Sequence, residues 1–310
     1  MKAYRFGACE HTFPCWGALA VQMAHEAGFE GLQLADAGGY LQPHPGNSGY
    51  VEYERYGLDL RRKDSFPLTF RRVQEDYLEA AASWQMELVS IYLYTLDYQG
   101  FIKYSKNTPQ GGQCLESIRS GVAAAEQMGI PSITIAVKGT FGTAQNQYAL
   151  ENLRYAVEQG ECHGIRIAVS TDLAPDAVRL LLDTFDGKVK LAMDTYTPLI
   201  CTSDIPADLI RSFGAEPVDH FRVRDFPPDK EGFPATEEAS LLGQGIARFA
   251  EAAQAVQDTG YTGWIFSDTP YYHPKLQAPG EDYVSLARRD VHALQTAFQS
   301  KTKSAGEDMI

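Results

Sequence analysis

Polar and apolar residues follow one pattern that recurs four times along the chain. A helical stretch ends at a glycine, and a run of apolar residues follows, in Ala24–Asp36, Ala124–Val137, Glu161–Val169 and Val256–Asp268. Glycine readily takes the left-handed backbone that ends a helix. The continuous apolar runs are typical of parallel strands that are covered on both faces. The pattern therefore predicts alternating strands and helices joined by right-handed crossovers.

Eight strands are predicted in this way: Tyr4–Ala8, Gly31–Ala35, Leu88–Tyr92, Ser132–Val137, Arg166–Val169, Lys190–Met193, His220–Val223 and Trp264–Phe266. Eight strand–helix units in 310 residues predict a single (β/α)8 TIM barrel over residues 1–300. A doubly wound open sheet is the alternative. No GxGxxG motif follows the first strand and no P-loop sequence occurs, which argues against that alternative.

Two segments do not fit a simple strand–helix unit. Residues 38–66 are too long for an ordinary loop, and we expect them to form an insertion that serves as a lid or a dimer contact. Residues 301–310 are mostly polar, and we expect a flexible tail there. No linker marks a domain boundary, so one domain is predicted.

The seventh predicted strand carries an unusual row of charges. Alternate side chains of a strand share a face, so His220, Arg222 and Arg224 should point one way. Arginine is rarely buried without a partner. This face belongs either to a solvated edge strand or to a strand that lines a polar pocket, and the apolar neighbours and the Pro-Pro stop favour the pocket.

The carboxyl ends of the strands are where a (β/α)8 barrel builds its site. The polar and aromatic residues at or just after those ends are Glu10, His11, Phe13, Trp16, Gln33, Asp36, Lys138, Ser170, Asp172, Asp194, Tyr196, His220, Arg222, Arg224, Asp268, Tyr271, Tyr272 and His273. Several also have structural explanations. Asp36 and Asp172 suit helix N-caps, the loop histidines could be solvated, and the tyrosines could pack at a rim. A strand-ending lysine such as Lys138 must pair, reach solvent or take part in chemistry.

Composition limits the classes of partner. With 44% hydrophobic and 22% charged residues, the chain is expected to bury a large core. A net charge of −13 argues against nucleic acid, because no basic patch would neutralise phosphates. No segment suits a membrane span or a signal peptide. The five scattered cysteines form no CxxC pair. We expect reduced thiols and a cytoplasmic protein.

The order of these strand ends resembles the xylose isomerase-like TIM barrel family of sugar phosphate isomerases and epimerases, also known from the AP endonuclease 2 fold. The resemblance covers roughly residues 4–298 and rests on Lys190–Thr195, His220–Asp225, Leu242–Phe249 and Gly260–Ile265. It implies a divalent metal bound by Glu, Asp, His and Glu from strands five to eight. It also implies proton transfer beside a sugar carbonyl, and relatives commonly form homo-oligomers.

This sequence departs from the family pattern at the metal positions. Ser170 stands at the position of the first Glu, Asp194 keeps the Asp, Arg222 stands at the position of the His, and Asp268 replaces the last Glu. Gln33 stands where the second strand often ends in Glu. Arginine has no lone pair to offer a cation, so no metal cofactor is expected. If Mn, Mg or Zn is bound, a shifted site of Asp172, Asp194, His220 and Asp268 is the alternative.

Three hypotheses follow for a small carbohydrate-like substrate. In the first, the barrel is an isomerase or epimerase without the usual metal. Arg222 supplies the positive charge, Asp194 and Asp268 act as acid and base, and Lys138 is a second acid or a Schiff-base nucleophile. The substrate-binding residues would be His11, Trp16, Ser170, Tyr196, His220, Arg224 and Tyr271. The second hypothesis is a non-catalytic sugar-binding or regulatory partner of a metal-bearing homologue, and the third is an ordinary metal-dependent isomerase with shifted ligands. DNA repair is opposed by the acidic charge.

Overall fold

The computed structural model describes residues 4–36, 67–96, 100–138, 148–197, 199, 205–235, 238–278 and 280–299. The insertion expected at 38–66 and the tail expected at 301–310 lie outside the described residues, so both stay predictions. Within the described helices, none combines the length and the apolar composition that a membrane-spanning segment needs.

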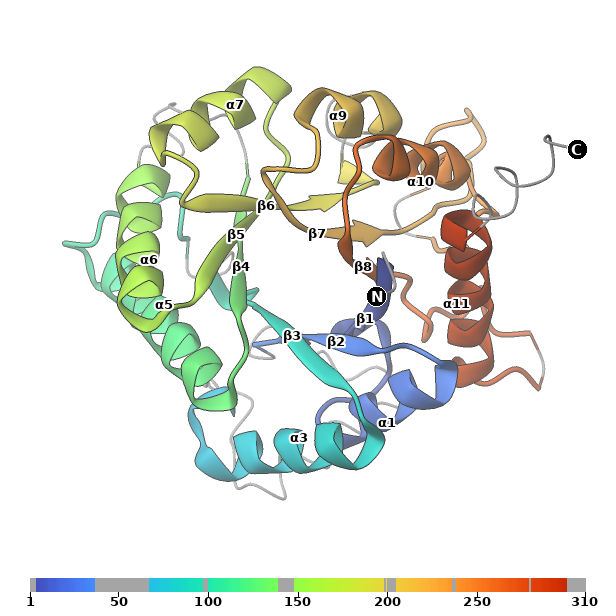
Figure 1. The fold of residues 1–310 in the computed structure, drawn as a ribbon, viewed down its shortest axis with the longest axis horizontal. Coiled ribbons are helices and arrows are strands. Elements are labelled where there is room, and N and C mark those ends of the chain that lie inside the picture. The colour runs from blue at the N-terminus through green and yellow to red at the C-terminus, as the bar shows by residue number, and fades with distance from the viewer. Residues whose placement is uncertain are drawn as a thin grey trace, which may run out of the picture.

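Eight parallel strands close into one barrel in chain order, as Figure 1 shows. They are β1 (Tyr4–Cys9), β2 (Gly31–Ala35), β3 (Glu87–Tyr92), β4 (Ser132–Val137), β5 (Arg166–Thr171), β6 (Val189–Asp194), β7 (Val218–Val223) and β8 (Gly263–Ser267). β8 pairs with β1 and closes the cylinder. The predicted (β/α)8 barrel and all eight of its strands are confirmed, and the doubly wound alternative is wrong.

Helices surround the barrel and cover the outer faces of its strands (Figure 1). They are α1 (Ala18–Ala27), α3 (Arg71–Trp84), α5 (Pro109–Met128), α6 (Ala149–His163), α7 (Pro175–Thr184), α9 (Pro206–Phe213), α10 (Phe249–Asp258) and α11 (Tyr283–Gln299), with single 3-10 turns η1 (Glu10–Thr12) and η2 (Pro67–Thr69). Gly28 ends α1 with a φ of 99°. This is the left-handed conformation that the recurring sequence pattern predicts.

The main hydrophobic core lies between the strands and these helices, and side-chain alternation along β7 shows how it is built. Phe221 and Val223 are buried in this core. His220 and Arg222 lie on the opposite face of the strand and are also buried, at 1% and 2% exposure. The predicted polar face of β7 is therefore confirmed, and it points into the barrel.

Candidate active site

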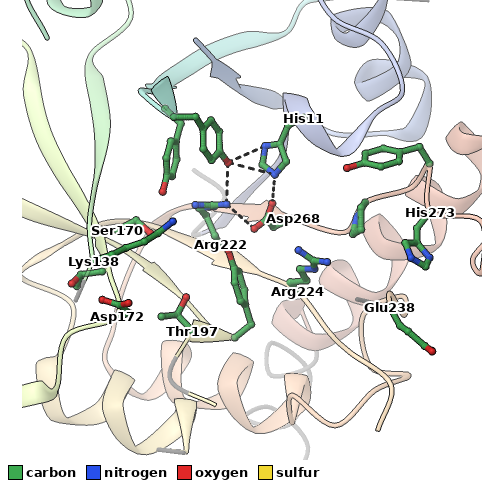
Figure 2. Close-up of a pocket in the computed structure, with 16 residues that line it drawn as sticks. His11, Lys138, Ser170, Asp172, Thr197, Arg222, Arg224, Glu238, Asp268 and His273 are labelled. Carbon is green, nitrogen blue, oxygen red and sulfur yellow. Dashed lines mark hydrogen bonds and ion pairs between the residues drawn. The ribbon is translucent and has the colours of Figure 1, made fainter. Parts of the chain in front are cut away.

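A cavity of about 580 Å³ opens at the carboxyl ends of the strands (Figure 2). This is the end of a (β/α)8 barrel where the loops after the strands build sites. Its lining comes from residues at the ends of β3, β5 and β7 and from residues that follow β1 and β3 to β8: His11, Tyr92, Tyr94, Lys138, Ser170, Thr171, Asp172, Tyr196, Thr197, Arg222, Arg224, Glu238, Asp268, Pro270, Tyr272 and His273.

Four of the lining side chains, those of His11, Tyr94, Arg222 and Asp268, form a closed polar ring. Figure 2 labels His11, Arg222 and Asp268 of this ring. The Arg222 Nη2 donates to Asp268 Oδ2 at 2.7 Å and to the Tyr94 hydroxyl at 3.2 Å. His11 Nε2 lies 2.7 Å from Asp268 Oδ1, and its Nδ1 lies 3.0 Å from the Tyr94 hydroxyl. Arg222 and Asp268 are almost fully buried, so a complete ion pair is held beneath the cavity.

The charge states of the ring follow from burial and from the ion pair. Burial alone would raise the pKa of Asp268, but Arg222 and His11 hold that pKa well below its usual range. Burial would lower the pKa of Arg222, but Asp268 raises it instead. Burial lowers the pKa of His11, with Asp268 opposing. At neutral pH the ring therefore consists of a carboxylate, a guanidinium, a neutral imidazole and a phenol.

These charge states decide the direction of each hydrogen bond in the ring. An ionised carboxylate only accepts, so His11 carries its hydrogen on Nε2, facing Asp268. The Nδ1 atom of His11 then accepts from the Tyr94 hydroxyl, whose oxygen accepts from Arg222. His11 is thus a neutral base with its tautomer fixed by a carboxylate.

Local backbone contacts fix the two ends of this ring. The Asp268 amide donates to the Val223 carbonyl at 2.8 Å, which extends the β7–β8 pairing to the site. On the other side, the buried Glu10 carboxylate accepts from the amides of Gly17 at 3.1 Å and Ala35 at 2.9 Å. Glu10 therefore holds η1, the turn that carries His11.

The rest of the cavity wall divides into two sides. Figure 2 shows Lys138, Ser170 and Asp172 on one side of the Arg222–Asp268 pair, and Glu238 and His273 on the other. Glu238 forms an ion pair with Lys275. Two aromatic rings, Tyr92 and Tyr94, stack at 3.7 Å between centroids, and the Arg222 guanidinium carbon lies 4.8 Å from the centre of the Tyr92 ring.

Seven of the eleven candidate catalytic and substrate-binding residues line the cavity: His11, Lys138, Ser170, Tyr196, Arg222, Arg224 and Asp268. Asp194, Trp16, His220 and Tyr271 do not. Asp194 accepts from the Thr197 amide at 2.7 Å and borders a separate cavity of about 50 Å³. Burial raises the pKa of Asp194. It is therefore not aimed into the cavity beside Asp268, as the acid–base pair would require.

The other three residues are buried away from the cavity. Trp16 packs edge-on against Tyr77, with ring centroids 5.6 Å apart. The Tyr271 hydroxyl lies 2.7 Å from Ser267 Oγ and donates to Asp290 behind β8 at 3.2 Å. His220 lies inside the barrel, and its partners there are Gln33 and Asp219. In each case the neighbours explain the residue as part of the packed structure.

The sequence profile of the xylose isomerase-like TIM barrel family matches residues 21–289. The chain belongs to this family. No curated protein sequence matches the chain.

Solved structures with the same fold include a D-allulose 3-epimerase from Methylomonas sp., 14% identical, with a TM-score of 0.66 over 95% of this chain and 98% of that one. An L-ribulose 3-epimerase is 14% identical, with a TM-score of 0.66 over 96% of this chain and 95% of that one. An IOLI protein with a bound zinc atom is 11% identical, with a TM-score of 0.69 over 96% and 99%.

The family's metal positions do not fit a divalent cation in this chain. Arg222 stands at one of them and donates to Asp268, which stands at another. A hard cation needs several oxygen or imidazole ligands, whereas this guanidinium brings a fixed positive charge and no lone pair. The shifted set of Asp172, Asp194, His220 and Asp268 does not converge either, because no three of these residues bring ligand atoms within 4.8 Å of one another.

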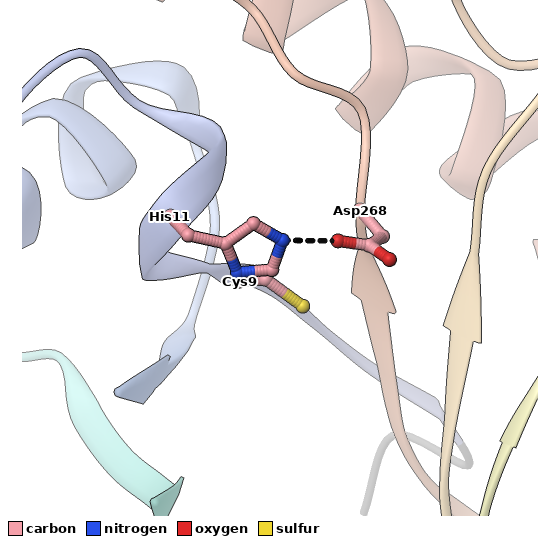
Figure 3. A group of neighbouring side chains, drawn as sticks. All are labelled: Cys9, His11 and Asp268. Carbon is pink, nitrogen blue, oxygen red and sulfur yellow. Dashed lines mark ion pairs between the residues drawn. The ribbon is translucent and has the colours of Figure 1, made fainter. Parts of the chain in front are cut away.

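A different cluster does converge in the described part of the chain. The ligand atoms of Cys9, His11 and Asp268 all lie within 4.8 Å of one another (Figure 3). A metal would need the Cys9 thiolate, but burial raises the pKa of this thiol far above its usual range. Asp268 already forms an ion pair with Arg222 and accepts a hydrogen bond from His11. The cluster therefore fits a metal poorly.

The sequence reasoning missed two tyrosines at the carboxyl end of β3. Tyr92 and Tyr94 are two positions apart, with Leu93 between them, and both line the cavity. The signal was present in the sequence, since alternate residues of an extended segment share a face. Thr171, at the end of β5, was also missed, because the predicted strand stopped at Val169. Thr197 and Glu238 were missed because they lie outside the strands, on segments whose path the sequence does not reveal.

Proposed function

We propose that this barrel is an isomerase or epimerase that moves a proton next to the carbonyl of a carbohydrate, without the family's usual metal. The observation that carries the proposal is the buried polar ring at the base of the cavity. It combines a fixed positive charge with a neutral base, and these are the two groups that such a reaction needs.

Arg222 takes the electrophilic role in this proposal. Removing a proton next to a carbonyl places negative charge on the carbonyl oxygen, and a guanidinium preorganised in a buried site can stabilise that charge. Asp268 balances the guanidinium before substrate arrives and holds it in place. The developing enolate oxygen would then share the Arg222 donors that face the cavity.

His11 takes the role of the base. Its imidazole is neutral at neutral pH because burial lowers its pKa, and Asp268 stabilises the imidazolium that forms. The proton can reach Nδ1 through the Tyr94 hydroxyl, which donates to that nitrogen and receives a hydrogen bond from Arg222. In this role Asp268 is a positioning residue, because its lowered pKa makes it a weak base.

Lys138 is the candidate for the second proton transfer. Figure 2 shows it on the side of the cavity opposite to His273 and next to Ser170. An epimerisation returns the proton to the other face of the carbon, so a donor away from His11 is required. The rings of Tyr92 and Tyr196 provide flat surfaces against which a sugar can pack.

Support for a carbohydrate comes from the family and from the solved structures with this fold. One of them is a complex of the Methylomonas D-allulose 3-epimerase with D-allulose, and another is a 3-keto-D-glucoside 4-epimerase from E. coli. Identities of 13% for both make these likenesses of fold, so the reaction itself needs a direct test.

The test is solvent-deuterium incorporation into a panel of aldoses, ketoses and inositols, followed by proton NMR. We expect exchange at a carbon next to the carbonyl in at least one sugar. Arg222→Lys and Arg222→Leu should lower the exchange rate by about 10²–10³-fold or more. Arg71→Gln, on the exposed surface of α3, is the control and should change nothing. Full activity in both Arg222 variants would rule the mechanism out, and sugar binding without exchange would favour the non-catalytic alternative.

A further inference from the structure

Arg224 is a second arginine that lines the cavity. Among the described residues, its guanidinium forms no ion pair, and its buried Nε has no hydrogen-bond partner. Other charged residues of the cavity wall do form ion pairs: Arg222 pairs with Asp268, and Glu238 pairs with Lys275. In a chain of net charge −13, a half-buried guanidinium without a carboxylate is a costly arrangement unless a ligand completes it.

The guanidinium is held in place by aromatic rings. Its carbon lies 4.5 Å from the centre of the Phe226 ring and 5.8 Å from that of Tyr196. Cation–π packing of this kind leaves the N–H edge of the guanidinium available for hydrogen bonds in the ring plane. Arg224 is therefore preorganised to receive a planar acceptor from the cavity.

The backbone after β7 shows which kind of acceptor suits this position. The glycine loop that follows has amide groups of the type that often bind phosphate. Here the buried Asp225 carboxylate already accepts from the amides of Gly243, Gly245 and Ala247, at 3.0, 3.0 and 2.8 Å. A phosphate would thus find no free amides in this loop. A single guanidinium can bind a carboxylate or a phosphate through two parallel hydrogen bonds. Because the loop offers a phosphate no further donors, the carboxylate is the better match here.

We propose, building on the function proposed above, that the substrate is a sugar acid and that Arg224 binds its carboxylate. Arg222 and Arg224 stand two residues apart on the same face of the β7 chain, roughly 7 Å along the strand. The carboxylate therefore lies several carbon atoms away from the carbonyl that reacts at Arg222. A hexuronate, with its aldehyde and carboxylate at opposite ends, has this arrangement.

The test is isothermal titration calorimetry with matched probes: D-glucose, D-glucuronate and D-glucose 6-phosphate, and the corresponding galactose set. We expect at least one hexuronate to bind about ten- to a hundredfold more tightly than its parent hexose. Arg224→Gln should remove this preference and leave hexose binding within about threefold. Arg224→Lys should keep part of the preference, because lysine retains the positive charge but lacks the two parallel N–H donors of the guanidinium.

Arg179→Gln is the matched control, because Arg179 also lies over a phenylalanine ring, that of Phe213, but far from the cavity on α7. Equal binding of hexose and hexuronate by the wild-type protein, or no hexuronate binding, overturns the inference without any variant. Tighter binding of the 6-phosphate overturns the carboxylate assignment.

The deuterium assay separates this inference from the proposed reaction. Arg224-dependent hexuronate binding without exchange would leave the inference standing and remove the reaction. Exchange into a neutral sugar by a protein that binds no hexuronate more tightly than its parent hexose would remove the inference and leave the reaction standing.

Discussion

At the scale of single residues, Asp268 shows how the contacts that set the charge of a buried carboxylate also limit its role in catalysis. It is 1% exposed and would be expensive to ionise alone, but Arg222 and His11 both contact it. Breaking such a buried pair by removing one partner typically costs about 3–5 kcal/mol. The same contacts make Asp268 a weak base, so the proton-accepting role passes to the neutral imidazole beside it.

His11→Gln tests that assignment. We expect kcat/KM to fall by about 10²–10⁴-fold, since a positioned general base contributes that much. The melting temperature should change little, because Asp268 keeps Arg222 as its partner. In the wild type the pKa of His11 is lowered, so activity should decline only as the pH falls below the usual histidine value of about 6.5. The variant should lose this acid limb, whereas His25→Gln on the exposed face of α1 should keep it. An unchanged pH profile in His11→Gln would show that another group is the base.

A second residue-scale prediction concerns Asp290, which lies outside the cavity. Burial raises the pKa of Asp290 to about 6, against hydrogen bonds from Leu242, Ser267 and Tyr271 that oppose the shift. The folded protein thus binds this proton more tightly than the unfolded chain, whose aspartate pKa is about 3.9. The free energy of unfolding should therefore decrease as the pH rises from about 4 to about 6, by up to about 3 kcal/mol.

Asp290→Asn should flatten this slope, because the amide has nearly the same shape and no charge. Urea unfolding at several pH values between 4 and 7 measures it, with the fully exposed Asp176→Asn as control. A slope that persists in Asp290→Asn would assign the titration to another group.

At the scale of elements, β7 shows which parts of a site follow from sequence. Strand alternation correctly placed His220, Arg222 and Arg224 on one face. It could not give their depth, because residues two apart on one face differ by roughly 7 Å along the strand. His220 therefore lies a layer below the cavity while its neighbours line it. Trp16 and Tyr271 were assigned to the cavity for a related reason. The sequence shows that an aromatic residue follows a strand, but it does not show whether the ring faces the cavity or packs against a buried neighbour.

His220→Ala tests the structural role of that lower layer. His220 Nδ1 lies 2.9 Å from Asp219 Oδ2, and its Nε2 lies 3.0 Å from Gln33 Nε2. The substitution removes one hydrogen bond from each partner, although Asp219 keeps Arg166 and Gln33 keeps Thr134. The free energy of unfolding should therefore fall by about 1–3 kcal/mol in urea titrations. The affinity for a bound sugar should stay within about twofold. A selective loss of sugar binding with stability intact would return His220 to the substrate-binding set; His292→Ala, exposed on α11, serves as the control.

At the scale of the whole molecule, the fold and the site depend on different kinds of sequence information. The barrel follows from a pattern of apolar strands and glycine-ended helices that the chain repeats, so many sequences satisfy it. Identities of 11–14% to the three structures described above agree with this. The ring instead needs side chains from four separate segments, one within β7 and the others after β1, β3 and β8, to meet within hydrogen-bond distance. Distances between side chains of different segments cannot be predicted from the sequence of each segment taken alone.

Metal binding by the intact protein is the prediction on which the fixed-charge proposal depends most. We expect protein purified with a chelator to keep its activity and to contain no stoichiometric Mn, Mg or Zn by elemental analysis. Adding each ion should leave the melting temperature unchanged, whereas an ion present at a hundredfold excess over its Kd would stabilise the folded state by about 2.7 kcal/mol.

The Cys9→Ala variant tests whether any zinc that binds does so at the Cys9–His11–Asp268 cluster. If zinc raises the melting temperature of the wild type but not of Cys9→Ala, the Cys9–His11–Asp268 cluster is a metal site. The positive charge at the base of the cavity would then come from the ion as well as from Arg222. His11 would be a ligand and no longer a free base, because a metal-bound imidazole cannot accept a proton at the same nitrogen. Proton transfer would have to pass to another group, and the mechanism built on the polar ring would be wrong.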